Sequence, residues 1–244
     1  MINGYAKNID ARFWVWRLVL LVFIATAGCA ARPGPQALLS VPTAETALRQ
    51  VTINVASTRA RDAVTGAYTD ARAPTLNYES FTVSIPPTHK ATKIELPKAN
   101  SDPMTSFAVT DRKLLPDLRF SAVQGQGKRD VLIFVHGYNY NFAESLFRLA
   151  QVAADGELTE MPILFAWPSA ASVVGYIADK DAVTYSRDDL VKVLMDVAAD
   201  PKVGKITLFG HSMGGWLVAE ALRQLRLTGQ DRVIARLDNV VLAG

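Results

Sequence analysis

Continuous apolar runs alternate with helical patterns over the C-terminal half of this 244-residue chain. The runs fall at 130–138, 161–169, 204–212 and 237–244, and an unbroken apolar strand is typical of a sheet buried on both faces. The segments between them place apolar residues at helical spacing. Strands that alternate with helices form right-handed βαβ units, so we predict an α/β fold with a mostly parallel sheet and helices on both faces.

The N-terminal half of the predicted domain has a different pattern. Residues 51–57 and 79–87 alternate apolar and polar side chains, which indicates two half-buried strands. Residues 91–97 and 106–111 are possible short strands. The polar, turn-rich residues 60–79 are expected to form a loop.

Helix boundaries are marked by capping signals. Asn141, with Glu144 three residues later, predicts a helix start, and Gly156 predicts its end. Ser186 is followed by acidic residues in the next turn, which predicts a second helix start. A third helix is expected to begin directly after Ser212.

The strand predicted before this third helix ends in the sequence GHSMG, residues 210–214. It matches the G-x-S-x-G pattern of a nucleophile elbow, in which a sharp strand-to-helix turn projects the serine hydroxyl above the sheet. Glycines flank the serine because side chains there would clash with the neighbouring strand and helix. We therefore predict Ser212 as a nucleophile; the alternative is that Ser212 only caps the following helix.

A second strand end, His136-Gly137-Tyr138, is expected beside the first, because the carboxyl ends of parallel strands meet at one edge of a sheet. Attack on an ester creates an oxyanion, which two backbone N–H donors can stabilise. We predict that Met213 supplies one donor and that Gly137 or Tyr138 supplies the other, with Tyr138 preferred. His136 is expected to bind loop backbone rather than to transfer a proton.

Several of these segments together resemble a known family. They are "INVASTRAR", "VLIFVHGYNYNFAESLFRLAQ", "FAWPS", "ITLFGHSMGG" and the residues Tyr176, Asp179 and Ser186. The chain resembles an α/β-hydrolase family of unknown function found in bacterial exported proteins and lipoproteins, over about residues 50–244. The resemblance implies an α/β-hydrolase fold and esterase- or lipase-like acyl transfer to Ser212. It implies no role for Trp167, Tyr176 or Asp179, so packing and hydrogen bonding are expected for them.

The partners of the serine are missing from the expected positions. In this fold the triad runs serine, then acid, then histidine. The chain holds three histidines, and all of them precede Ser212: His89, His136 and His211. The acid is expected directly after the strand at 237–244, and Asp179 or Asp181 is a weaker replacement. We therefore expect a C-terminally incomplete fragment that is inactive as written; the alternative is a non-catalytic envelope lipoprotein that uses a degenerate hydrolase fold as a binding module.

The N-terminus has the pattern of an export signal. A basic stretch precedes the apolar run at 18–28, which is followed by Cys29, the only cysteine in the chain. We predict a lipoprotein-type signal over 1–28, an acylated Cys29 and tether over 29–50, and the hydrolase domain over 51–244. These features predict a protein of the bacterial cell envelope that a lipid anchors to a membrane, with the outer membrane favoured. The alternative is a plain signal peptide or a membrane anchor. Intact mass of the mature protein tests it, since an unlipidated Cys29 at the N-terminus contradicts acylation.

Charge and composition restrict the partners. The net charge is +3, and no Lys/Arg cluster stands out, so nucleic-acid binding is not expected. Scattered histidines and a single cysteine lack metal-ligand spacing, so no metal or cofactor is expected. The expected partner at the site is a small ester-like substrate.

Overall fold

The computed structural model describes residues 32–42, 49–97, 102–118 and 127–244. The compact unit described below comprises Pro33–Gly244. Cys29 and the expected signal lie outside the described residues. Within the described ranges, no helix combines the length and apolar character that crossing a bilayer requires.

A seven-stranded sheet forms the centre of the unit, in the order β3-β2-β1-β5-β4-β6-β7. The strands are β1 (Gln50–Arg61), β2 (Tyr68–Ser84), β3 (Ala108–Leu115), β4 (Arg129–Val135), β5 (Met161–Ala166), β6 (Val203–His211) and β7 (Leu237–Ala243). Along the part of the sheet ordered β1-β5-β4-β6-β7, each strand pairs in parallel with its neighbour. Strand β2 pairs antiparallel with both β1 and β3. The mostly parallel sheet predicted from the alternating pattern is confirmed.

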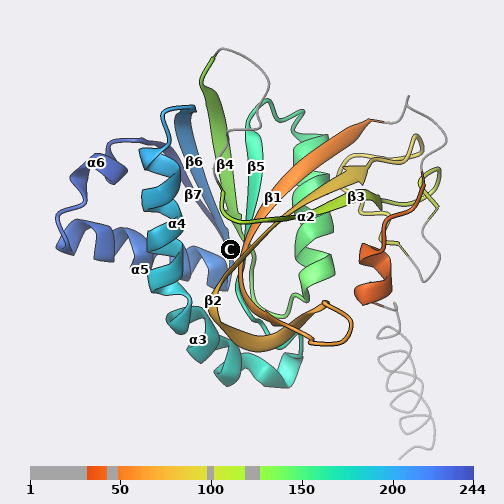
Figure 1. Ribbon diagram of the computed structural model, residues 1–244, viewed down its shortest axis with the longest axis horizontal. Helices are drawn as coiled ribbons and strands as arrows, with labels where there is room; N and C mark the ends of the chain where they lie inside the picture. The colour runs from red at the N-terminus through yellow and green to blue at the C-terminus, as the bar shows by residue number, and fades with distance from the viewer. Residues whose placement is uncertain (1–31, 43–48, 98–101, 119–126) are drawn as a thin grey trace, which may run out of the picture. The chain divides into compact units, whose positions relative to one another are not determined.

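Helices lie on both faces of this sheet, as predicted. The helical elements are η1 (Pro35–Leu38), α2 (Phe142–Asp155), η3 (Val173–Gly175), α3 (Tyr176–Tyr185), α4 (Arg187–Ala199), α5 (Met213–Leu227) and α6 (Asp231–Ile234). One hydrophobic core cluster contains η1 and α2 side chains, and the other contains side chains of α3, α4, α5 and α6. In Figure 1, α2 accordingly stands apart from α4 and α5.

Strand β4 shows why an unbroken apolar run predicted a doubly covered strand. Val131, Ile133 and Val135 belong to the α3–α6 cluster, whereas Leu132 and Phe134 belong to the α2 cluster. Successive side chains of a strand point to opposite faces, so both faces need apolar residues when both are covered. Strand β4 accordingly lies in the interior of the sheet, between β5 and β6, and the residues after Val135 lie at the carboxyl edge of the sheet.

The N-terminal strands differ from their predicted bounds. The loop expected at 60–79 is largely strand, because β2 begins at Tyr68 and pairs with an extended β1. Register shifts beyond Ser57 interrupt the two-residue alternation, so the pattern there did not indicate a strand. The possible strand at 91–97 is not formed, although the one expected at 106–111 corresponds to the start of β3.

The segment between residues 33 and 39 belongs to the compact unit rather than to a free tether. Ala37 and Leu38 of η1 are buried in the α2 cluster. Asn141 donates a hydrogen bond from its side chain to the carbonyl of Pro33 at 3.0 Å. The domain therefore begins earlier than the predicted residue 51.

The helix starts agree with the capping signals in part. Asn141 and Glu144 form a reciprocal capping box at the start of α2. Helix α3 was not predicted, because only three of its residues, Asp179, Ala182 and Val183, are buried and its apolar periodicity is correspondingly weak.

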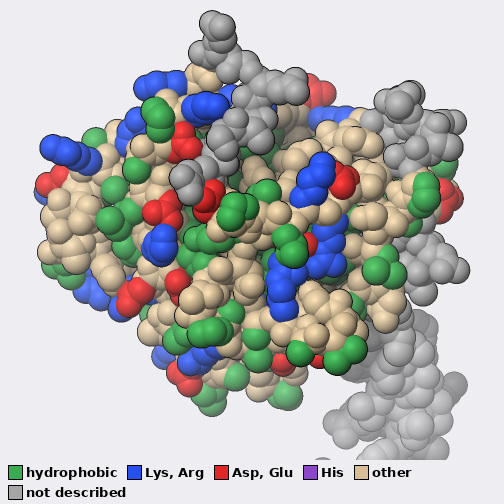
Figure 2. All heavy atoms as spheres, viewed as in Figure 1, with side chains coloured by type: hydrophobic (Ala, Val, Ile, Leu, Met, Phe, Trp, Pro, Cys, Tyr) green, Lys and Arg blue, Asp and Glu red, His purple; other side chains and the backbone are tan. Residues whose placement is uncertain are grey.

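Charges of both signs are interspersed over the face of the molecule shown in Figure 2.

Candidate active site

Ser212 occupies a strained turn between β6 and α5. Its backbone has φ 51° and ψ −124°, and its side chain makes no capping hydrogen bond to the helix. A positive φ is uncommon for a residue that is not glycine, and such strain concentrates at functional turns. The alternative that Ser212 serves only as a helix cap is therefore not supported, and the elbow geometry expected from the G-x-S-x-G pattern is present.

The glycines on either side of the serine permit the backbones to approach closely. A Cβ on Gly210 would lie 2.6 Å from the Cα of Gly215, and a Cβ on Gly214 would overlap the carbonyl oxygens of Val135 and His136. Helix α5 therefore begins in direct contact with the end of β4. This contact brings the serine to the edge where β4 ends.

Gly137 joins the two strand ends. A Cβ at this position would lie 2.7 Å from Nδ1 of His211 and 3.0 Å from Cβ of Ser212. A side chain at 137 would therefore push the loop after β4 away from the elbow. The structure thus brings together the two strand ends that the sequence placed at one edge, as the parallel sheet requires.

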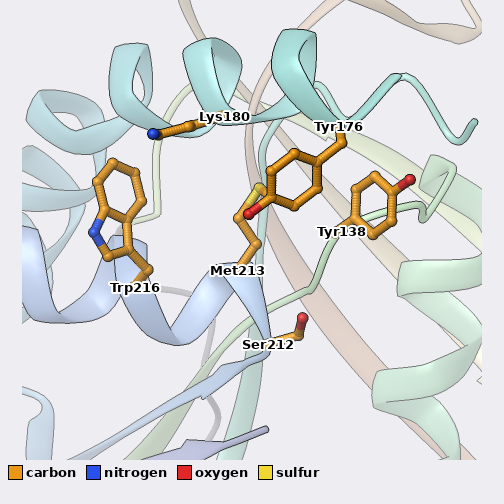
Figure 3. Close-up of a pocket in the computed structure, with 6 residues that line it drawn as sticks. All are labelled: Tyr138, Tyr176, Lys180, Ser212, Met213 and Trp216. Carbon is orange, nitrogen blue, oxygen red and sulfur yellow. The ribbon is translucent and has the colours of Figure 1, made fainter. Parts of the chain in front are cut away.

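A pocket of about 320 Å³ opens beside Ser212. It is lined by Tyr138, Tyr176, Lys180, Ser212, Met213 and Trp216 (Figure 3). The two predicted oxyanion-hole residues, Tyr138 and Met213, thus lie at the same pocket as the nucleophile. The assignment of their backbone N–H groups to an oxyanion stays a prediction.

The aromatic wall of this pocket is held by the loop that follows β5. The ring of Tyr138 meets that of Tyr176 edge to face, with centroids 5.4 Å apart. The Tyr138 hydroxyl donates to the carbonyl of Val173 and lies 3.2 Å from the carbonyl oxygen of Ser172. Tyr176, to which the sequence gave no role, is therefore a lining residue at the mouth of the pocket, where it is half exposed.

His136 is a structural residue, as expected. It is fully buried, and its ring stacks on Trp167 at 4.9 Å. Its Nδ1 lies 2.9 Å from the carbonyl oxygen of Gly137 and its Nε2 lies 3.0 Å from that of Trp167. Burial, together with the positive charge of Arg59, lowers the pKa of His136 to about 3. The neutral ring carries one N–H and donates to one of these oxygens, while Trp167 Nε1 donates to the His136 carbonyl at 2.7 Å.

Asp179 supports the loops rather than replacing the triad acid. Its carboxylate is fully buried and accepts hydrogen bonds from Ser169 Oγ at 2.5 Å, from the Ala170 N–H at 2.6 Å and from the Asn139 N–H at 3.3 Å. These donors lie in the loops after β4 and β5. Hydrogen bonding, the role expected by default, is thus what the structure gives this residue.

Arg59 is a site component that sequence reasoning missed. The side chain is 2% exposed, and its guanidinium donates to the carbonyls of Thr69, Ser169 and Tyr140 at 3.1, 3.2 and 2.9 Å. Burial lowers its pKa to about 10, although the nearby Asp179 charge acts in the opposite direction. Arg59 stays charged at neutral pH and ties the loops after β4 and β5 to the end of β1.

The described residues supply no base that is hydrogen bonded to the Ser212 hydroxyl. His89 is bonded to Glu95 at 2.7 Å and to Asp155 at 2.8 Å, beside α2. His211 packs against the Tyr140 ring, with centroids 6.1 Å apart, and burial lowers its pKa. Over the ranges that the structure describes, no three His, Cys, Asp or Glu side chains are grouped as metal ligands would be.

Comparison with protein families identifies a family for the C-terminal half of the chain. The model described as "Alpha/beta hydrolase of unknown function (DUF900)" matches residues 119–244, slightly more than half of the chain. Comparison with curated proteins gives no match, and comparison with solved structures gives none either. The matched region contains β4, the loop at Gly137 and Tyr138, the elbow at Ser212 and the strand after it. The chain, with its mostly parallel sheet and strand–elbow–helix turn, belongs to this family of α/β hydrolases of unknown function.

Proposed function

We propose that this protein is a serine hydrolase of the esterase or lipase type and that Ser212 is its nucleophile. The observation that carries the proposal is the strained turn at Ser212, φ 51°, with the residue lining an open pocket. Strain of this kind projects a hydroxyl away from its own backbone and toward a bound substrate. A serine that only caps a helix has no need of it.

The proposed reaction is acyl transfer followed by hydrolysis. Ser212 Oγ attacks the ester carbonyl carbon, an Oγ–C bond forms, and the carbonyl electron pair moves to the oxygen. The N–H groups of Met213 and Tyr138 stabilise this oxyanion, and loss of one such donor typically costs about 3 kcal/mol. When the tetrahedral intermediate collapses, the ester C–O bond breaks, and the alcohol leaves with the proton taken from Oγ. Water then releases the acid by the same route.

The proton must be held by a base, which an acid orients. In the α/β-hydrolase order the acid follows the strand after the elbow helix, and the histidine comes later. That strand is β7 here, and its carboxyl end lies at the elbow: the Ser212 N–H donates to the Ala243 carbonyl at 2.6 Å. The residue after β7 is Gly244, and an acid that follows it closely in the chain would come near Ser212. We propose this position for the triad acid.

Ester turnover by the full-length gene product tests the proposal. Hydrolysis of short-chain p-nitrophenyl esters is expected in the wild type, and Ser212→Ala is expected to reduce kcat by about a thousandfold or more. Ser172→Ala is the matched control, because this serine lies near the pocket without lining it. Equal loss in the two variants, or full turnover by Ser212→Ala, contradicts the nucleophile assignment.

A second function rests on one observation. Among the described residues no histidine or carboxylate is hydrogen bonded to the Ser212 hydroxyl, so the same pocket suits a non-catalytic binding module. A folded, stable full-length protein that turns over no ester supports this alternative. We also propose the envelope location and the acylation of Cys29, and the intact mass of the mature protein tests the acylation.

A further inference from the structure

We infer that the pocket at Ser212 selects esters that carry a negative group, a carboxylate or a phosphate, at the end remote from the scissile carbonyl. Lys180 is the specificity-determining residue. The inference rests on the proposed function for the ester group. The preference for an anionic group is a property of ligand binding, so it can be tested without catalysis.

Lys180 gives the pocket its charge. The other five lining residues are two tyrosines, a tryptophan, a methionine and the serine, so Lys180 is the only charged side chain among them. The pocket therefore combines an apolar, aromatic wall with a single cation. Pockets of this kind bind a ligand through apolar contact and orient it by a few polar groups.

No carboxylate neutralises this cation in the part of the chain that the structure describes. Other lysines have such partners: Lys113 pairs with Asp111, Lys192 with Asp196 and Lys205 with Asp238. Asp179, which precedes Lys180 in α3, is buried and is bonded to Ser169 and Ala170 instead. Lys180 is exposed, so its ammonium group is available to a ligand.

Figure 3 shows how the cation and the nucleophile are separated. Ser212 lies at one end of the pocket, below the rings of Tyr138 and Tyr176. The Lys180 side chain extends from α3 toward Trp216, on the other side of Met213. A substrate that places its ester at Ser212 and runs along Met213 therefore brings its far end to the ammonium group. The geometry selects bifunctional esters: ester at one end, apolar middle, anion at the other end.

The size of the preference follows from the exposure of Lys180. Ion pairs in contact with water contribute about 0.2–1 kcal/mol, which corresponds to a preference of about 1.4- to fivefold for an anionic over a neutral ligand of equal length. The attraction is screened by salt, with a Debye length of about 10 Å at 0.1 M. The preference should therefore decline between low and high ionic strength, which a merely structural role of Lys180 does not predict.

The binding test uses the Ser212→Ala form, so that no ester is consumed. Monomethyl adipate, which carries one carboxylate, and dimethyl adipate, its neutral counterpart, are titrated separately while the Trp216 indole N–H signal is followed by NMR. That signal is assigned by its loss in Trp216→Phe. The monoester is expected to bind about 1.4- to fivefold more tightly at low salt, and the diester affinity is expected to be independent of salt. Equal affinities overturn the inference.

Charge variants of the lysine complete the binding test. Lys180→Met should remove the preference while leaving the diester affinity unchanged, and Lys180→Glu should reverse it. Lys128→Met is the matched control, since it makes the same change in net charge on an exposed residue before the amino end of β4. Retention of the preference in Lys180→Met, or an equal loss in Lys128→Met, contradicts the assignment.

Kinetics separate this inference from the proposed function. In the wild-type, full-length protein the monoester should have the higher kcat/KM by a similar factor, through KM, and Lys180→Met should abolish the difference. If no ester is hydrolysed, p-nitrophenyl esters included, but the monoester still binds preferentially, the proposed hydrolase function is wrong and the anion site stands. If both are hydrolysed at equal efficiency, the hydrolase function stands and the anion site is wrong.

Discussion

Two adjacent glycines at the start of α5 should respond oppositely to substitution by alanine. A Cβ on Gly214 would lie 2.9 Å from the carbonyl carbon of Val135 and would overlap the carbonyl oxygens of Val135 and His136. Those atoms are strand backbone and cannot rotate away as a side chain can. A Cβ on Gly215 meets its nearest atom, the Gly210 carbonyl oxygen, at 3.4 Å, which is ordinary contact.

The magnitudes follow from this difference in contact. Overpacking typically costs about 1–3 kcal/mol, and the backbone clash places Gly214→Ala at the upper end, about 3 kcal/mol. For a domain of this size that loss lowers the Tm by roughly 6–12 °C. Gly215→Ala relieves the backbone entropy cost of glycine in a helix, so it should be neutral or stabilising by up to about 1 kcal/mol.

Urea unfolding followed by circular dichroism measures both free energies of unfolding. Gly214→Ala should be less stable than Gly215→Ala by about 3 kcal/mol or more. Similar stabilities, within about 1 kcal/mol, refute the close approach of α5 to β4 on which the elbow geometry depends.

Two further predictions concern the buried groups around the site. Asp179→Ala leaves one buried donor and two half-buried donors without their acceptor and deprives Arg59 of a nearby negative charge, so it should cost about 3–5 kcal/mol. Asp179→Asn, which keeps one oxygen, should cost less, and equal losses in urea unfolding contradict the carboxylate role. Because burial and Arg59 lower the folded pKa of His136 to about 3, the unfolded chain binds a proton that the folded chain does not, over about pH 6.5 to 3. Stability should therefore decrease as pH falls through this window, with a smaller slope in His136→Gln, and equal slopes in the two proteins contradict the neutral, buried ring.

The parts of the fold that the sequence predicted are those set by local pattern. The apolar run of β4 and the capping box of α2 each lie within a short segment, so their structure could be inferred from spacing alone. The elbow at Ser212 is also local, because its glycines and its strand–turn–helix context are contiguous in the chain. Its strain and the pocket beside it agree with the motif.

The rest depends on contacts between distant residues. Arg59 binds the carbonyl of Ser169, 110 positions away, and that of Tyr140, 81 positions away, which no local pattern encodes. The available signal was the arginine that follows the run "INVAST" at the carboxyl end of a strand, where buried charges often serve a site. Tyr176 and Lys180 were missed as lining residues because α3 has too little apolar periodicity to be recognised.

The most direct test of the central claim is to label the full-length protein with a fluorophosphonate and to map the adduct by peptide mass spectrometry. Such reagents react with activated serines, so the account predicts one adduct, on Ser212, which is absent from Ser212→Ala and retained in Ser172→Ala. An adduct on another serine, or no adduct on a protein that is folded by circular dichroism, contradicts the assignment of Ser212 as the nucleophile.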